Sequence, residues 1–121
     1  MSHRPHPSMF SKIGIAISTT SGMGAGKVTK DIAQHFFYLG IPFTFRLAFS
    51  VLAMSWDEVS AKKKESIRRK VSKTARNIIA KSGKIKPGVK TRFVFAMMRL
   101  MQKRNNWNSV DKNHWEINGW I

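Results

Sequence analysis

The stretch that decides the fold is KIGIAISTTSGMGAGKV, residues 12–28. Its first part, KIGIAIS (12–18), is a short, β-branched and nearly continuous apolar run, which is typical of a strand buried on both faces in a parallel sheet. A turn-forming segment with Gly22, Gly24 and Gly26 at alternate positions follows it. A glycine turn between a strand and a helix start exposes backbone N–H groups next to a helix dipole, and both attract anionic groups. The segment is therefore a candidate nucleotide site, although it could also be only a tight turn that packs a helix on a strand.

Regular elements continue on the carboxyl side of this loop. VTKDIAQHFFYLG (28–40) predicts a helix that ends at Gly40, with an apolar face at three- and four-residue spacing made of Val28, Ile32, Phe36 and Leu39. FTFRLAFSVLAM (43–54) alternates as a strand does, with Phe43, Phe45, Leu47, Phe49 and Val51 on one side. The order strand, helix, strand predicts a right-handed crossover and parallel pairing.

Two further helices and a tail are expected after the second strand. Ser55 and Glu58 resemble a capping box, and the helix after them carries an apolar stripe of Val59, Ile67, Val71, Ala75, Ile78 and Ile79. The break at 82–88 separates it from a third helix over 89–104, which has Phe93, Met97, Leu100 and Met101 on one face. The tail, from residue 105, has three tryptophans and no regular period.

Two strands are too few for a sheet that is stable by itself. Ile13, Ile15 and Ile17 form a run that needs a neighbouring strand on each side. We therefore expect a single, partial α/β domain over 1–121. It divides into an irregular lead-in (1–11), a strand–loop–helix–strand–helix unit (12–82), and a C-terminal helix with a tryptophan-rich tail (83–121).

The glycine loop does not satisfy either of two well-known phosphate-binding patterns. A P-loop needs glycine at position 21 and serine or threonine at position 28, where this chain has Ser21 and Val28. The dinucleotide pattern G-x-G-x-x-G needs glycine at position 27, where this chain has Lys27. The loop therefore belongs to neither class of site.

The charge of the chain is high and unevenly distributed. The formal net charge is +16, and 16 of the 22 basic residues lie between Lys62 and Arg104 with Glu65 as the only acid. Such a segment attracts polyanions, although a solvated helix face has the same composition. Because the chain has no cysteine, disulfides and thiolate chemistry are excluded. The N-terminus lacks the pattern of a signal peptide, and the expected location is the cytoplasm.

Four segments together resemble one family, the flavodoxin-like NAD(P)H-dependent FMN oxidoreductases. IGIAISTTSGMGAGKVTKDIAQHFFYLG (13–40) looks like the fourth strand of that family with its loop and helix. HRPHPSMFSK (3–12) is similar to the lead into that strand, and SWDEVSAKKKESIRRKV (55–71) resembles the start of the last core helix. HWEINGWI (114–121) resembles the aromatic–glycine–tryptophan tail of several members. The likeness covers nearly the whole chain, from about His3 to Ile121.

The resemblance implies a partial flavodoxin-like fold, formed by the two C-terminal parallel strands with flanking helices. It implies that the helix at 89–104 covers the core and that the tail packs against the sheet or a dimer partner. It also implies an FMN site at the carboxyl ends of the strands, with NAD(P)H as co-substrate. Of the three loops that hold FMN in the family, only the one after the fourth strand has a counterpart here. Its expected flavin-contacting residues are Thr19, Thr20, Ser21, Gly22, Met23, Gly24 and Ala25.

The family's phosphate-binding loop and its proline–tyrosine segment have no counterpart in the sequence. We therefore expect a truncated or split chain with an incomplete flavin site that is inactive alone. No catalytic residue and no metal ligand is assigned. The expected partners are flavin and either a complementary N-terminal half or a second copy in a homodimer.

Two rival interpretations stay open. One is a small basic protein that binds nucleic acid or an anionic membrane surface through residues 62–104, with the basic, amphipathic stretch TRFVFAMMRLMQKR (91–104) as a membrane or partner helix. The other is a remnant without function, whose exposed sheet edge pairs with other chains.

Overall fold

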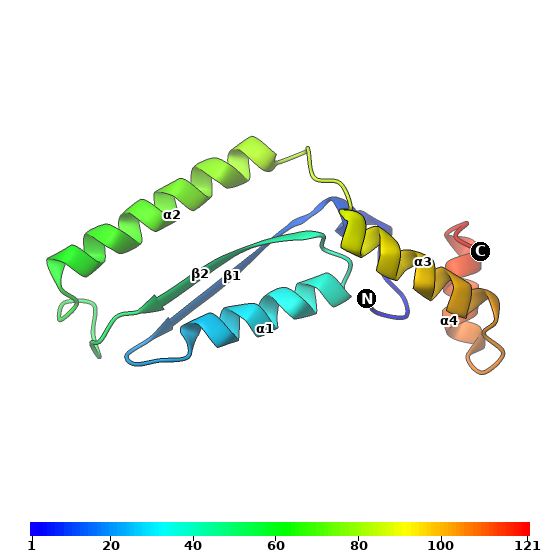
Figure 1. Ribbon diagram of the computed structural model, residues 1–121, viewed down its shortest axis with the longest axis horizontal. Helices are drawn as coiled ribbons and strands as arrows, with labels where there is room; N and C mark the ends of the chain where they lie inside the picture. Colours follow the sequence, from blue (N-terminus) through cyan, green and yellow to red (C-terminus); the bar gives the residue numbers. More distant parts are fainter.

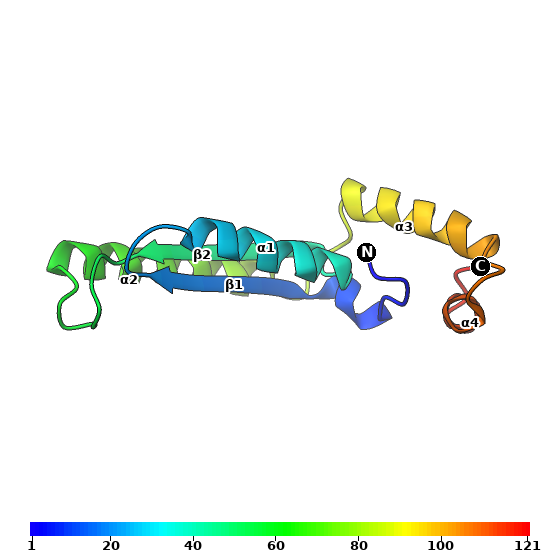
Figure 2. The same ribbon diagram turned by 90° about the horizontal axis from the view of Figure 1, so that it is seen from below.

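The computed structural model describes residues 1–121 as a two-stranded parallel sheet with four helices. A short 3-10 turn, Pro7–Ser11, leads into strand β1, Ile13–Thr20, and helix α1, Ala25–Tyr38, connects it to strand β2, Phe43–Ser50. The sheet lies between α1 and helix α2, Ala61–Lys81 (Figures 1 and 2). Helices α3, Val89–Lys103, and α4, Ser109–Ile117, lie beyond the end of the sheet at which the strands begin (Figure 1). The predicted α/β class and the predicted parallel pair are confirmed, and the wider flavodoxin-like fold stays a prediction.

The two faces of the sheet differ in the size of their side chains. A Cβ built on Gly14 would lie 2.6 Å from a ring carbon of Phe36 and 2.7 Å from the hydroxyl of Thr44, so this face meets α1 at close range. Since side chains alternate along a strand, the isoleucines of β1 and the Phe43–Phe49 row of β2 point to the other face. There, the amines of Lys70 and Lys81 on α2 lie over the rings of Phe49 and Phe43 at 6.0 and 5.0 Å.

Helix α2 covers only the part of that face formed by β2. The register pairs Ile17 with Leu47, yet Leu47 is 8% exposed and Ile17 is 59% exposed. No residue of α2 is fully buried, and its predicted apolar stripe stays half open, with Val71 and Ile79 both exposed. The stripe is covered only in part because the sheet beneath the helix is narrow.

The core is correspondingly small. Only 15 of 121 residues are buried, and they are split between the sheet and the junction of the two chain ends. The outer edge of β1 pairs with no other strand, and neither does that of β2. The chain therefore leaves open the backbone and the apolar surface at which a wider parallel sheet would continue, as the isoleucine run predicts.

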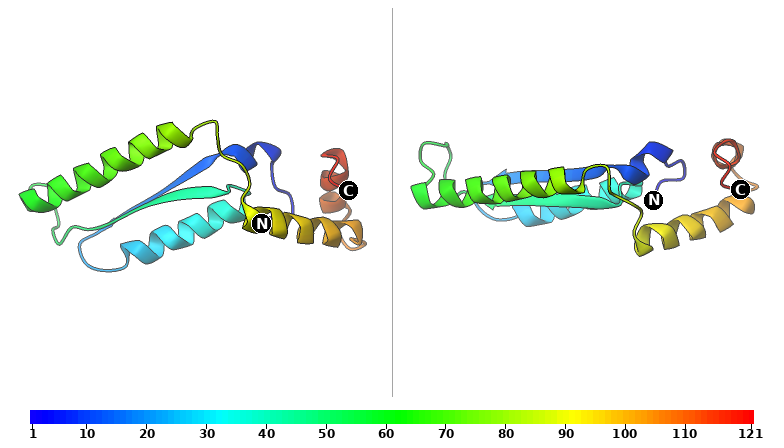
Figure 3. Two further views of the ribbon diagram at one scale, coloured as in Figure 1. Left: turned by 45° about the horizontal axis from the view of Figure 1, so that its top comes forward. Right: turned by 90° about the horizontal axis from the view of Figure 1, so that it is seen from above.

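The two chain ends pack against each other. The indole nitrogen of Trp115, which is fully buried, donates to the carbonyl of His3 at 2.6 Å. The carboxylate of Asp111 lies 3.1 Å from the guanidinium of Arg4, and the rings of Phe10, Phe95 and Trp120 meet edge to face. The tail thus folds as α4 on α3 and the lead-in (Figure 3), and not against the sheet, which was one of the two placements that the family resemblance implied.

Four other sequence expectations are corrected. Helix α1 begins at Ala25 rather than at residue 28, and its buried row is Ala25 and Thr29 while Val28 and Leu39 are exposed. Helix α2 begins after Ser60, whose hydroxyl accepts from the N–H of Lys63. The carboxylate of Glu58 instead accepts from the N–H groups of Met54 and Ser55 and closes a turn. Helix α3 does not cover the core, because Phe93, Met97, Leu100 and Met101 are all exposed.

Candidate functional site

The glycine loop joins β1 to α1 at the carboxyl edge of the sheet. Gly24 precedes the first helical residue with a φ of 104°, a conformation that glycine adopts at little cost and other residues rarely adopt. No side chain caps the helix, and the N–H of Lys27 donates to the carbonyl of Gly24 at 2.9 Å, so the N–H groups of Ala25 and Gly26 are left for other acceptors. A Cβ built on Gly22, Gly24 or Gly26 would meet no atom within 4 Å, so a ligand can approach the loop backbone closely.

Hydrogen bonds tie this loop to the ends of both strands. The N–H of Gly22 donates to the hydroxyl of Thr20 at 3.2 Å, and the hydroxyl of Ser50 donates to the carbonyl of Gly22. The N–H of Val51 donates to the carbonyl of Thr20 at 2.8 Å, extending the pairing one residue past the strands. The loop is thus held in place by β2 while most of its surface stays open to solvent.

A hollow of about 480 Å³ lies beside the loop on the isoleucine face. Thr19, Thr20 and Ser21 form part of its wall from the β1 side. The opposite wall is mainly apolar and comes from β2, the loop that follows it and α2, with Phe49, Val51, Met54, Trp56, Val59 and Ile67. An apolar wall faced by a few hydroxyls and exposed amides suits a flat, largely apolar ring with a polar edge.

The structure brings together only part of the predicted flavin-contacting set. Thr19, Thr20 and Ser21 line the hollow, whereas Gly22, Met23, Gly24 and Ala25 do not. The side chain of Met23 is almost wholly exposed, and that of Ala25, the first residue of α1, is buried, so Ala25 could contact a ligand only through its backbone. The seven residues therefore form one wall of the hollow and an adjoining exposed turn, not a single pocket.

The loop that follows β2 contributes residues that the sequence interpretation missed. Met54 and Trp56 face the hollow, and the amine of Lys64 lies 5.3 Å from the ring centre of Trp56. Leu52 in the same loop has a φ of 54°, which is strained for a branched residue. The signal that could have found them is topological, because the loops after two parallel strands always meet at the same edge.

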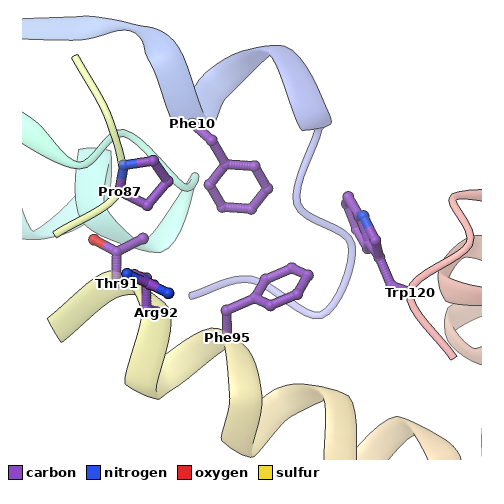
Figure 4. Close-up of a pocket in the computed structure, with 6 residues that line it drawn as sticks. All are labelled: Phe10, Pro87, Thr91, Arg92, Phe95 and Trp120. Atoms are coloured by element: carbon purple, nitrogen blue, oxygen red, sulfur yellow. The ribbon is translucent and has the colours of Figure 1, made fainter. Parts of the chain in front are cut away.

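A second cavity, of about 300 Å³, lies at the opposite end of the molecule (Figure 4). Phe10, Phe95 and Trp120 surround it together with Pro87, Thr91 and Arg92. It marks the place where the lead-in, α3 and the tail converge. Because Phe10 precedes β1, this cavity is at the amino ends of the strands and takes no part in the glycine-loop site.

Other features of the surface bear on ligand class. No helix combines the length and the apolar content that crossing a bilayer requires. None of the nine basic side chains of α2 forms an ion pair with an acid.

No protein family, curated protein or solved structure matches this chain.

Proposed function

We propose that this chain supplies the carboxyl-terminal half of a flavodoxin-like, NAD(P)H-dependent FMN oxidoreductase, with a flavin site that another polypeptide segment completes. One observation carries the proposal. The open glycine loop and the mainly apolar hollow share the carboxyl edge of a parallel strand pair, next to a β1 edge that has no neighbour. In open parallel sheets this edge is where nucleotide ligands bind.

The residues at this edge fit the ring of FMN and not its phosphate. The hollow offers apolar side chains for the face of an isoalloxazine, and Thr19, Thr20 and Ser21 offer hydroxyls for its polar edge. The unpaired amides of residues 23–26 add donors that would favour negative charge on the reduced ring. A phosphate cradle would have to come from the complementary segment, since no second glycine- or serine-rich loop lies at this edge.

The contribution of the chain to such a reaction is positioning and electrostatics. The redox chemistry would belong to FMN, which takes up a hydride from NAD(P)H and passes the electrons to an acceptor. Thr20 and Ser50 hold the glycine turn through the bonds to Gly22, so its amides keep a fixed direction. The apolar wall would keep water from one ring face. No side chain is assigned as an acid or a base.

Titration with FMN tests the proposal. The purified chain alone should bind FMN weakly, because it lacks the phosphate contacts. The chain co-expressed with the polypeptide encoded immediately upstream should give a yellow complex that oxidises NAD(P)H. Tight one-to-one binding by the isolated chain would contradict the incomplete site, and no gain on co-expression would contradict the completing segment.

A matched pair of glycine variants locates the site within that complex. Gly24→Ala and Gly83→Ala both place alanine at a positive φ, of 104° and 72°, where an added Cβ meets no atom. Both should cost about 1–2 kcal/mol of backbone strain. Only Gly24→Ala should weaken FMN binding, because Gly83 lies in the break after α2. Equal FMN affinity in the two variants would remove the glycine turn from the site.

A second candidate function is attraction to polyanions. The specific observation is the run of nine unpaired basic side chains along one exposed helix, α2, in a chain of net charge +16. Such a helix raises the local concentration of any anionic partner. Affinity for DNA that falls steeply with salt, and that is lost when the charges of α2 are reversed, would support it.

A further inference from the structure

We propose that α3 binds an anionic phospholipid bilayer, lying flat in its surface. The inference rests on α3 alone and is independent of the flavin site. Helix α3 has 15 residues, contains no acid, and leaves uncovered a row of large apolar side chains, namely Val89, Phe93, Met97, Leu100 and Met101. We call this row the α3 stripe.

The α3 stripe lies on the side of the helix opposite its packing contacts. Its members follow one another at three- and four-residue spacing, so they share one face. The buried residues Thr91 and Gln102, with half-buried Phe95, lie on the other face, toward the lead-in and α4. Phe93 is 63% exposed and Leu100 is 56% exposed. The helix is thus anchored on one side and free on the other.

The charges beside the α3 stripe identify its occupant. Arg92, Arg99 and Lys103 are spaced by seven and four residues, which places them along one flank of the stripe. All three are exposed and none has an acidic partner. An apolar face bordered by cations, on a helix too short and too charged to span a bilayer, is the pattern of an interfacial helix on anionic lipid.

Charge also argues against the other occupants of an apolar face. A second copy of this chain would bring the same cations to the contact, since the net charge is +16. Nucleic acid would be bound by the cations, but it offers no apolar surface to cover Phe93, Met97 and Leu100. An anionic bilayer satisfies both halves of the surface, because its headgroups meet the cations and its acyl boundary takes the apolar side chains.

Sedimentation of the full-length chain with vesicles tests the proposal. The chain should bind vesicles of equal parts phosphatidylglycerol and phosphatidylcholine and should not bind vesicles of pure phosphatidylcholine. The double variant Phe93→Ser, Leu100→Ser should lose at least about tenfold in affinity for each side chain. Because both residues are more than half exposed, the fold should survive, which circular dichroism checks. The control Ile79→Ser, Val110→Ser removes two apolar residues that are also more than half exposed, from α2 and α4, and should bind normally.

A second pair of variants separates α3 from the general charge of the chain. Replacing Arg92, Arg99 and Lys103 by glutamate should lower the affinity for anionic vesicles about fivefold for each cation, or about a hundredfold together. Replacing Arg68, Arg69 and Arg76 of α2 by glutamate changes the net charge by the same amount and should lower the affinity for vesicles much less. Equal losses in the two triple variants would overturn the assignment to α3.

Insertion can be observed directly because the chain has no native cysteine. The emission of a polarity-sensitive dye attached at Met97→Cys should shift to the blue when anionic vesicles are added. The emission of the same dye at Ser72→Cys in α2 should not shift. No vesicle binding, or binding unaffected by Phe93→Ser, Leu100→Ser, would refute the proposal. A concentration-dependent dimer that this double variant abolishes would assign the stripe to a second copy instead. If the chain bound duplex DNA in preference to anionic vesicles, and lost that binding when the charges of α2 were reversed, the proposal would be overturned and α2 would be the binding surface.

Discussion

Replacing Leu47 and Ile17 separately by alanine should affect the stability of the isolated chain very differently. The two residues are register partners on one face of the sheet, but Leu47 is 8% exposed and Ile17 is 59% exposed. Truncation of a buried leucine costs about 2–5 kcal/mol, and a narrow sheet that can relax places Leu47→Ala near the low end. Solvent already reaches most of Ile17, so Ile17→Ala should cost about 1 kcal/mol or less.

Urea unfolding followed by far-ultraviolet circular dichroism measures the difference. With a slope of about 1–2 kcal/mol per molar urea, Leu47→Ala should lower the midpoint by about 1 M or more and Ile17→Ala by about half of that or less. If another segment completes the proposed oxidoreductase, a neighbouring strand would cover Ile17, and Ile17→Ala should then weaken the association of the two segments. Equal costs of the two substitutions in the isolated chain would refute the open face of β1, and with it the argument that a further strand belongs there.

Three other substitutions test the local structure. Gly14→Ala should destabilise the fold by about 1–3 kcal/mol, because its Cβ would overlap Phe36 and Thr44, and Phe36→Leu in the same chain should recover part of that loss in urea unfolding. Ser60→Ala should cost about 1 kcal/mol of stability, because it removes the acceptor for the N–H of Lys63, and hydrogen exchange in the first turn of α2 should become faster. Ser55→Ala should leave that exchange unchanged, and faster exchange in this control would mean that Ser55 is the cap. Trp115→Phe leaves the carbonyl of His3 without its donor and should lower the stability by about 1–3 kcal/mol. Proteolysis of the lead-in should become faster, and an unchanged rate would mean that the two chain ends do not stabilise each other.

The elements nearest the glycine loop could be predicted from sequence because their signals are local. The isoleucine run predicted β1, and the alternation from Phe43 to Phe49 predicted β2. The glycine at position 40 predicted the end of α1, and all three predictions agree with the structure within a few residues. The predicted start of α2 was wrong because Ser55 and Glu58 match the capping-box pattern, whereas Ser60, three residues before Lys63, does not. Only the structure shows that Glu58 bonds to the turn before the helix and that Ser60 is the cap. Helix α4 was missed because its nine residues are too few for a periodic signal.

The exposed stripes of α2 and α3 show what periodicity leaves open. An apolar period tells which side of a helix is apolar, but the presence of a surface to cover that side depends on the rest of the fold. Here the sheet is too narrow for α2, and α3 lies beyond it (Figure 1). For the site, the turn at Thr19–Ala25 could be found by its residues, whereas Met54 and Trp56 could be found only by their position at the carboxyl edge.

The most direct test of the central claim is the amide spectrum of the completed protein during titration with FMN. Gly22, Gly24 and Gly26 resonate in a sparse region of a nitrogen–proton correlation spectrum, so they can be followed individually. If this chain supplies the flavin-facing turn, the amides of these glycines should shift strongly with FMN, while Gly83 and Gly88 in the break after α2 should stay in place. Shifts confined to residues outside 19–26 would contradict the claim.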